Sequence, residues 1–178
     1  MWALVEDSKV TKVYTRPTAI TINDTQYPAN IMSSWTATQL KALGLYEVII
    51  DNSNYKNPEY YMNTNQEFAF ASNKVTATYG TAKAMDLDTL KTEHKQTISN
   101  QAYGLLQPND WLVVRKQEAG TDIPSDWSTY RSQVRASATS MQAKIEAAGD
   151  VDALAALYVY NDADPPVRPM GEFPTPPE

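Results

Sequence analysis

Two short segments of the chain carry the same residue types in the same order. PNDWLVVR (108–115) and PSDWSTYR (124–131) each contain a proline, a short polar residue, an aspartate, a tryptophan and a final arginine. A carboxylate, an indole and a guanidinium that occur twice could form a paired active site built on the two carboxylates. Such a site needs a cleft and carboxyl groups with shifted pKa values, and nothing in the sequence indicates either.

The alternative interpretation is that each segment begins a helix. Asn109 and Ser125 are residue types that cap helix N-termini. Asp110 and Asp126 then fall in the first turn, where a carboxylate meets the positive end of the helix dipole. Each of these structural roles contributes about 0.5–1 kcal/mol. We therefore expect the doubled motif to start two successive helices and to contain no catalytic residue.

Within each copy the tryptophan and the arginine are four residues apart, which places them on the same face of a helix. Arg115 is therefore expected to lie over Trp111. In the same way, Arg131 is expected to lie over Trp127, with both indoles buried.

The enzymatic alternative is a carboxylate-based hydrolase that acts on cell-wall or surface glycans. It needs two acidic side chains across a groove. The acidic residues on or near predicted strands are Glu47, Asp51, Glu59 and Glu67. The sequence favours no pair among them, so we expect a protein that is not an enzyme.

Composition narrows the remaining classes of site. The net charge is −6 and the basic residues are scattered, which argues against nucleic acid as a partner. The chain has no cysteine and a single histidine, His94, so we expect no metal site and a half-buried or interface role for this histidine. Gly80 and Gly104 belong to no phosphate-binding pattern, and we expect no cofactor.

No segment has the length and apolar character of a membrane span, and no signal peptide pattern is present.

The hydrophobic pattern predicts an α+β fold. Residues 1–83 read as a β-rich N-terminal module, with hairpins around residues 6–9 and 72–73 and one short helix capped by Thr36 and Gln39. The segment YPANIMSS (27–34) reads as a loop.

Residues 84–160 read as a helical module. Its longest helix begins near Pro124 and has a periodic apolar face at Trp127, Tyr130, Val134, Ala138, Met141 and Ile145. A last helix spans residues 151–160. Residues 161–178 are proline-dense and are predicted to form an extended tail, suited to docking along a partner surface.

Two further segments are candidate contact surfaces. Residues 87–102 form a helix with a narrow apolar stripe, which either packs on the neighbouring module or pairs with copies of itself in a homo-oligomer. Tyr55, Tyr60 and Tyr61 lie in a predicted loop. They form either an exposed contact patch or the packing of that loop onto the sheet.

The segment from Leu105 to Arg135 resembles the phage tail assembly chaperone family, also described as tail fibre assembly-like. Members carry a leucine-rich helix end, a Thr-Asp-Trp step and then W-x-x-Y-R-x-x-[LV]-R on the following helix. The matching positions here are Leu105, Leu106, Asp110, Trp111, Trp127, Tyr130, Arg131, Val134 and Arg135. Asn109 stands where the family usually has threonine, and both are N-cap residues. The N-terminal part is more loosely similar to uncharacterised proteins of marine and environmental phages.

This resemblance implies a small non-enzymatic protein of the tail module, without catalytic residues. Its implied partners are phage tail or tail-fibre proteins, and its implied location is the virion tail, after assembly in the bacterial host cytoplasm. Two fates stay open. The chain is either a retained structural or adaptor component, which we favour, or a transient assembly chaperone that leaves before the particle is complete. The interaction candidates in the doubled motif and the helix after it are Trp111, Arg115, Trp127, Tyr130, Arg131 and Arg135.

Overall fold

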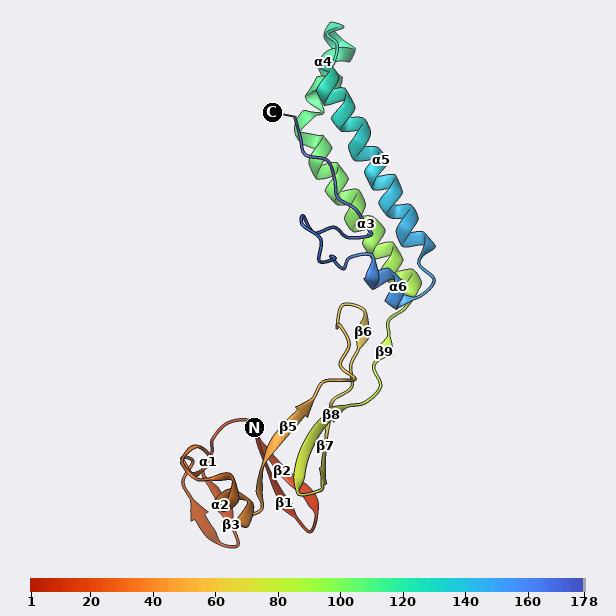
Figure 1. Ribbon diagram of the computed structural model, residues 1–178. Coiled ribbons are helices and arrows are strands. Elements are labelled where there is room, and N and C mark those ends of the chain that lie inside the picture. Colours follow the sequence, from red (N-terminus) through yellow and green to blue (C-terminus); the bar gives the residue numbers. More distant parts are fainter. Residues whose placement is uncertain (178) are drawn as a thin grey trace. The chain divides into compact units, whose positions relative to one another are not determined.

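A computed structural model describes residues 1–177 of the chain (Figure 1). The fold is α+β, as the sequence predicts. The chain divides into two compact units, the first spanning Met1–Lys83 and the second beginning at Ala84. The second unit also contains the proline-rich segment that the sequence pattern set apart as a tail.

The first unit is built on a five-stranded sheet with the strand order β2-β1-β5-β8-β7. The five strands are β1 (Trp2–Glu6), β2 (Lys9–Tyr14), β5 (Leu45–Asp51), β7 (Gln66–Ala71) and β8 (Lys74–Tyr79). All neighbouring strands are antiparallel except β5 and β8, which are parallel.

Both hairpins predicted in this unit are confirmed. Asp7 and Ser8 join β1 to β2, and Ser72 and Asn73 join β7 to β8. All four residues have positive φ, which matches the right-handed twist of the strands in two-residue turns. A third turn of this kind joins β3 (Ile20–Ile22) to β4 (Thr25–Tyr27).

Two short helices follow, where the sequence predicted one. The predicted helix is α2 (Ala37–Ala42), and the capping box between Thr36 and Gln39 is present. The expectation of a plain loop over residues 27–34 was wrong, because α1 (Ile31–Ser34) forms there. Ile31 and Met32 are buried in the core beneath the sheet, and this burial stabilises a single turn that local pattern does not indicate.

Hydrophobic cores cover both faces of the sheet. One core joins strand residues to the short helices and consists of Leu4, Tyr14, Ile20, Ile22, Ile31, Met32, Leu40 and Leu45. The other is smaller and is built on Ala3, Val48, Val75 and Ala77. A separate two-stranded ladder pairs β6 (Tyr61–Met62) with β9 (Lys83–Ala84).

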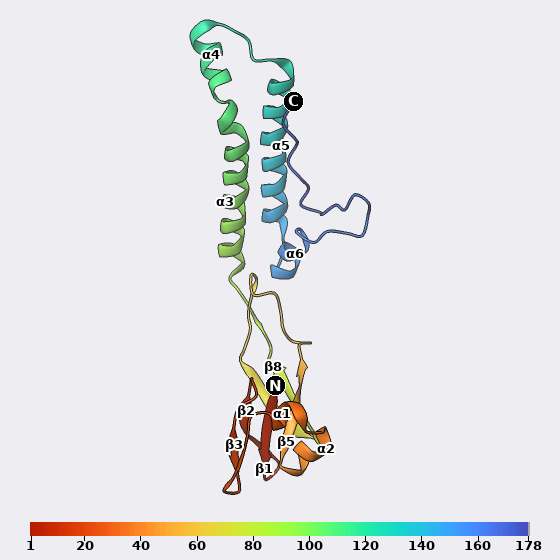
Figure 2. The same cartoon turned by 90° about the vertical axis from the view of Figure 1, so that its left-hand side faces the viewer.

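The second unit is a helical hairpin. Its elements are α3 (Leu87–Leu106), the 3-10 turn η1 (Gln107–Asn109), α4 (Trp111–Ala119), α5 (Ser125–Ala147) and α6 (Val151–Ala156). Helices α3 and α5 lie side by side in two perpendicular views, with α4 at the end where the chain turns back (Figures 1 and 2). The predicted apolar face of α5 is confirmed, since Tyr130, Val134, Met141 and Ile145 are buried.

The apolar stripe of α3 packs along α5 of the same unit. Leu90, Ile98 and Ala102 are buried there. Of the two alternatives for residues 87–102, the structure shows packing of the stripe inside the chain, against α5, and the homo-oligomer stays a prediction. His94 is half-buried, as expected, and its Nδ1 lies 2.7 Å from the hydroxyl oxygen of Tyr158.

The proline-rich segment contains no helix or strand within residues 161–177. From Met170 on, however, it packs against the helices of the second unit. Met170 is 1% exposed, and its N–H donates to the carbonyl of Leu157. The chain then runs along the α3–α5 pair toward the end where α4 lies (Figures 1 and 2). The last predicted helix is shorter than expected, because α6 ends at Ala156 rather than near residue 160.

Candidate interaction site

The two copies of the doubled motif meet at the end of the helical hairpin, through Arg131. This arginine is only 6% exposed, and its guanidinium reaches back from α5 to the chain between α3 and α4. Nη1 donates to the carbonyl of Leu106 at 3.1 Å and to the side-chain oxygen of Asn109. Nη2 donates to Asp110 at 2.7 Å. We call these four residues the Arg131 network.

The expectation that the two copies are equivalent helix starts was wrong. Asn109 lies in η1 and does not cap α4; its amide donates to Leu105 while its oxygen accepts from Arg131. The N-cap of α4 is Asp110, without a side-chain capping bond. Ser125 is the first residue of α5, and the N-cap position is Pro124. Asp126 does lie in the first turn of its helix, as predicted.

The Trp–Arg stacking prediction holds for one copy only. The guanidinium of Arg115 lies 4.9 Å from the ring centre of Trp111. Arg131 does not stack on Trp127, because its guanidinium donates to Leu106, Asn109 and Asp110. Trp127 packs edge-on against Tyr130 instead, with ring centres 5.8 Å apart. A buried guanidinium needs several acceptors, and the turn before α4 provides them where an indole face does not.

A small apolar pocket lies between the two motif copies and has a volume of about 320 Å³. Its lining residues are Pro108, Asn109, Trp111, Leu112, Arg115, Pro124 and Trp127. We call it the tip pocket. The prediction that both tryptophans are buried was wrong for Trp111, which is 57% exposed, and holds only in part for Trp127, which is half-buried. Val113 and Val114, which follow on the same helix, are also exposed but do not line the pocket.

Arg115 combines two properties at the wall of the tip pocket. Its guanidinium stacks on Trp111, while its Nε is buried and has no hydrogen-bond acceptor among the described residues. No ion pair of Arg115 is found in residues 1–177. A buried donor without an acceptor lowers the stability of the folded state by about 1–3 kcal/mol. Natural proteins contain few such groups.

The other candidate residues fall outside this pocket. Arg135 is exposed, and its Nη1 donates to the carbonyl of Arg131 at 3.3 Å. Tyr55 is exposed and packs on Tyr79, whereas Tyr61 is half-buried beneath Lys56. Tyr60 is 3% exposed. The three tyrosines therefore do not form one exposed patch.

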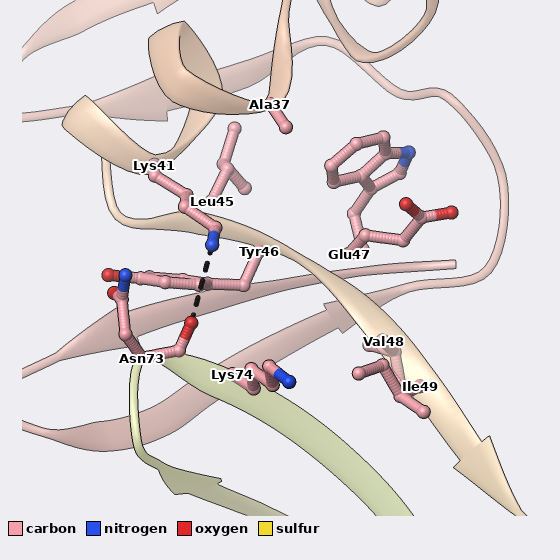
Figure 3. Close-up of a pocket in the computed structure, with 10 residues that line it drawn as sticks. Ala37, Lys41, Leu45, Tyr46, Glu47, Val48, Ile49, Asn73 and Lys74 are labelled. Atoms are coloured by element: carbon pink, nitrogen blue, oxygen red, sulfur yellow. Dashed lines mark hydrogen bonds between the residues drawn. The ribbon is translucent and has the colours of Figure 1, made fainter.

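A second pocket, of about 340 Å³, lies in the first unit beside β5. Figure 3 shows Lys41 reaching from α2 across Tyr46 to the carbonyl of Asn73, a hydrogen bond of 3.3 Å. Of the acidic residues considered for hydrolysis, only Glu47 lines this pocket, together with Lys41 and Lys74. Asp51 lies elsewhere on β5, and the backbone N–H of Ser53 lowers the pKa of its carboxyl group by hydrogen bonding.

The described residues contain neither a cluster of metal-ligand side chains nor a helix that could span a membrane. Within residues 1–177, no three histidine, aspartate or glutamate side chains are grouped as metal ligands would be. No helix in that range combines the length and the apolar character that crossing a membrane requires.

Sequence reasoning missed three contributors to this end of the hairpin. Val113 and Val114 are exposed although they are apolar, and Phe173 packs against the buried cluster of Ala102, Tyr130 and Val134. The consecutive valines in PNDWLVVR are a signal for the first two, because adjacent positions on a helix cannot share one buried face. No local signal places Phe173.

Comparisons of the chain with protein-family models, curated proteins and solved structures find no match in any of the three. The resemblance of residues 105–135 to tail assembly chaperones therefore stays a prediction.

Proposed function

We propose that this chain is a protein-binding adaptor of a bacteriophage tail, retained in the virion as a structural component of the tail or tail fibre, and that the tip pocket and the exposed apolar residues of α4 form its binding surface. The observation that supports this proposal best is the exposure of Trp111 beside Val113 and Val114. An exposed tryptophan at a pocket is typical of binding hot spots, and neighbouring exposed apolar side chains are typical of interaction surfaces.

The Arg131 network supports the same proposal from the structural side. It holds the end of α3, the start of α4 and the first turns of α5 together through a buried guanidinium. A surface that is rigid before binding loses less conformational entropy when a partner docks. The unpaired Nε of Arg115 adds a polar group for which a partner can provide a carbonyl or carboxylate acceptor, after a small shift of the side chain.

Quantitative peptide mass spectrometry on purified infectious particles tests retention in the virion. A fixed copy number per particle is the expected result. Absence from particles together with presence in lysates would overturn retention and favour a transient assembly chaperone. Release of reducing sugars from host envelopes above the buffer level would contradict a non-enzymatic role.

Complementation with variants tests the tip pocket itself. Trp111→Ala is expected to reduce the copy number in particles at least tenfold, because loss of an aromatic hot-spot side chain weakens binding by about 2 kcal/mol or more, and Val114→Ser is expected to reduce it by a smaller factor. Val159→Ser is the matched control, since Val159 is another exposed valine of the same unit, 64% exposed against 52% for Val114. Unchanged incorporation of both tip variants would show that the partner binds elsewhere.

A further inference from the structure

The C-terminal residues of the described chain lie on the helical hairpin as a bound peptide would. We call residues 168–177 the strap. Phe173 packs against Ala102 of α3 and against Tyr130 and Val134 of α5. Beyond it, Thr175, Pro176 and Pro177 line a shared pocket with the first turns of α5, including Tyr130 and Gln133. Phe173 thus packs against a cluster formed by both helices, and the prolines after it lie against α5; we call this surface under the strap the α3–α5 groove.

The two halves of the strap are held very differently. The first half is anchored by buried Met170 and by Lys144, whose Nζ donates to the carbonyls of Pro169 at 2.8 Å and Met170 at 3.1 Å. Arg168 and Glu172 form an ion pair of 2.7 Å. Gly171, with φ of 86°, then redirects the chain.

The second half, residues 173–177, makes no hydrogen bond in the part of the chain that the structure describes. Its contacts are one half-buried phenylalanine and the proline rings. Three of its five residues are prolines, whose fixed φ reduces the entropy lost on docking. The second half is therefore held by fewer specific interactions than the first.

We propose that the α3–α5 groove is a binding site for peptide segments with an aromatic residue followed by Pro-x-Pro, and that residues 173–177 occupy it as a displaceable intramolecular ligand. The groove supplies an aromatic wall in Tyr130 and an aliphatic floor in Ala102 and Val134, which suits recognition of proline-rich segments by their ring faces. The partner is a second polypeptide that presents such a segment. This site is distinct from the tip pocket, and its test is independent of the proposed function.

Because the strap belongs to the same chain as the groove, its effect on the affinity for a free peptide can be estimated. A short flexible linker holds its ligand at an effective concentration in the millimolar range. A peptide with an intrinsic dissociation constant of about 0.1 mM would therefore bind the wild-type chain about tenfold more weakly than a chain whose own strap is disabled.

The experiment is a titration of the isotope-labelled full chain with the peptide GEFPTPP, which copies residues 171–177. In the variant Phe173→Ala, saturable chemical-shift changes are expected at the amides of Ala102, Tyr130 and Val134. The wild-type chain should need about ten times more peptide. A peptide with alanine in place of phenylalanine is the matched control and should give no saturable change.

A second variant guards against a general loss of structure. Pro174→Gly with Pro176→Gly keeps Phe173 but increases the backbone freedom of the strap, and it should also bind the peptide more tightly than the wild type does. Circular dichroism establishes that both variants keep their helices. If the peptide fails to give saturable shifts in either folded variant at millimolar concentration, the groove is not a peptide site and the strap is only structural.

Discussion

Asp110, in the first Pro-x-Asp-Trp segment, accepts a hydrogen bond from Arg131, the last residue of the second, with 2.7 Å between Oδ1 and Nη2. The carboxylate of one copy therefore pairs with the arginine of the other. Neither residue acts inside its own copy in the way that the repeated spacing predicts. The pair joins the start of α4 to α5 and brings Trp111 and Trp127 to one pocket.

Replacing Arg131 should lower the free energy of unfolding of the second unit. Arg131→Met leaves the buried oxygen of Asn109 and the carbonyl of Leu106 without their donor, and the free energy of unfolding should fall by about 2–4 kcal/mol. The bond to Asp110 contributes less to this figure because that carboxylate is half exposed to solvent. Urea unfolding followed by helical circular dichroism measures the change.

Arg135→Met provides the comparison for that variant, since Arg135 is exposed one helical turn further along α5. Its effect should stay within about 0.5 kcal/mol. Equal losses for the two variants would mean that the Arg131 network does not stabilise the hairpin.

The N-cap of α3 should make stability depend on pH in the acid range. Asp86 accepts hydrogen bonds from the hydroxyl and backbone N–H of Thr89, which lower the pKa of its carboxyl group below the ordinary value of 3.8. Because the folded-state pKa is the lower one, this stabilisation is fully present above about pH 4 and is lost as pH falls through the folded-state pKa.

Asp86→Asn removes this titration and keeps a capping oxygen. The urea midpoint of the second unit should therefore fall more steeply in the wild type than in the variant as pH decreases below 3.8. Other carboxyl groups titrate in both proteins and cancel in the comparison. Parallel pH profiles for the two proteins would contradict the assignment.

Two glycine-to-alanine substitutions should act in opposite directions. Gly44 has φ of 78°, and a Cβ there would lie 2.8 Å from the carbonyl oxygen of Val5. Gly44→Ala should destabilise the first unit by more than about 1 kcal/mol.

Gly104 lies inside α3, and a Cβ there would meet no atom within 4 Å apart from the neighbouring backbone of its own helix. Gly104→Ala should therefore stabilise the second unit by about 0.5–1 kcal/mol, because alanine favours the helix. Thermal melting of both variants measures the two signs. A stabilised Gly44→Ala would show that β1 and the end of α2 are not packed as described.

The two units have separate cores, so core truncations should act locally. Leu40 is fully buried in the first unit and Ile145 in the second. Each substitution to alanine should cost its own unit about 2–5 kcal/mol. Residue-resolved hydrogen exchange should show faster exchange within residues 1–83 for Leu40→Ala, and within α3 and α5 for Ile145→Ala. Exchange that rises across the whole chain for either variant would indicate one cooperative unit.

Local chemistry explains which elements could be predicted. The turn at Ser72 and Asn73, the capping box of Thr36 and the apolar face of α5 all depend on residues within a few positions of one another. The short helix α1 could not be predicted in this way, because it depends on the burial of Ile31 and Met32 in a core that includes residues far away in the sequence.

In the candidate site, too, the sequence predicts contacts within one helix but not contacts between helices. The spacing of four residues correctly places Arg115 over Trp111, since both lie on one helix. The same spacing fails for Arg131, because a buried guanidinium binds the best set of acceptors within reach, and those acceptors come from the preceding turn.

The sequence by itself determined the class of fold, the hairpin turns, the helix faces and the presence of two tryptophans next to helix starts, because these follow from periodicity and from capping over short distances. The tertiary structure decided which of those tryptophans is exposed, which arginine is buried, and that the proline-rich segment returns to the groove between α3 and α5. These outcomes depend on contacts between residues far apart in the chain, where the competition among burial, charge and available acceptors has no local signature.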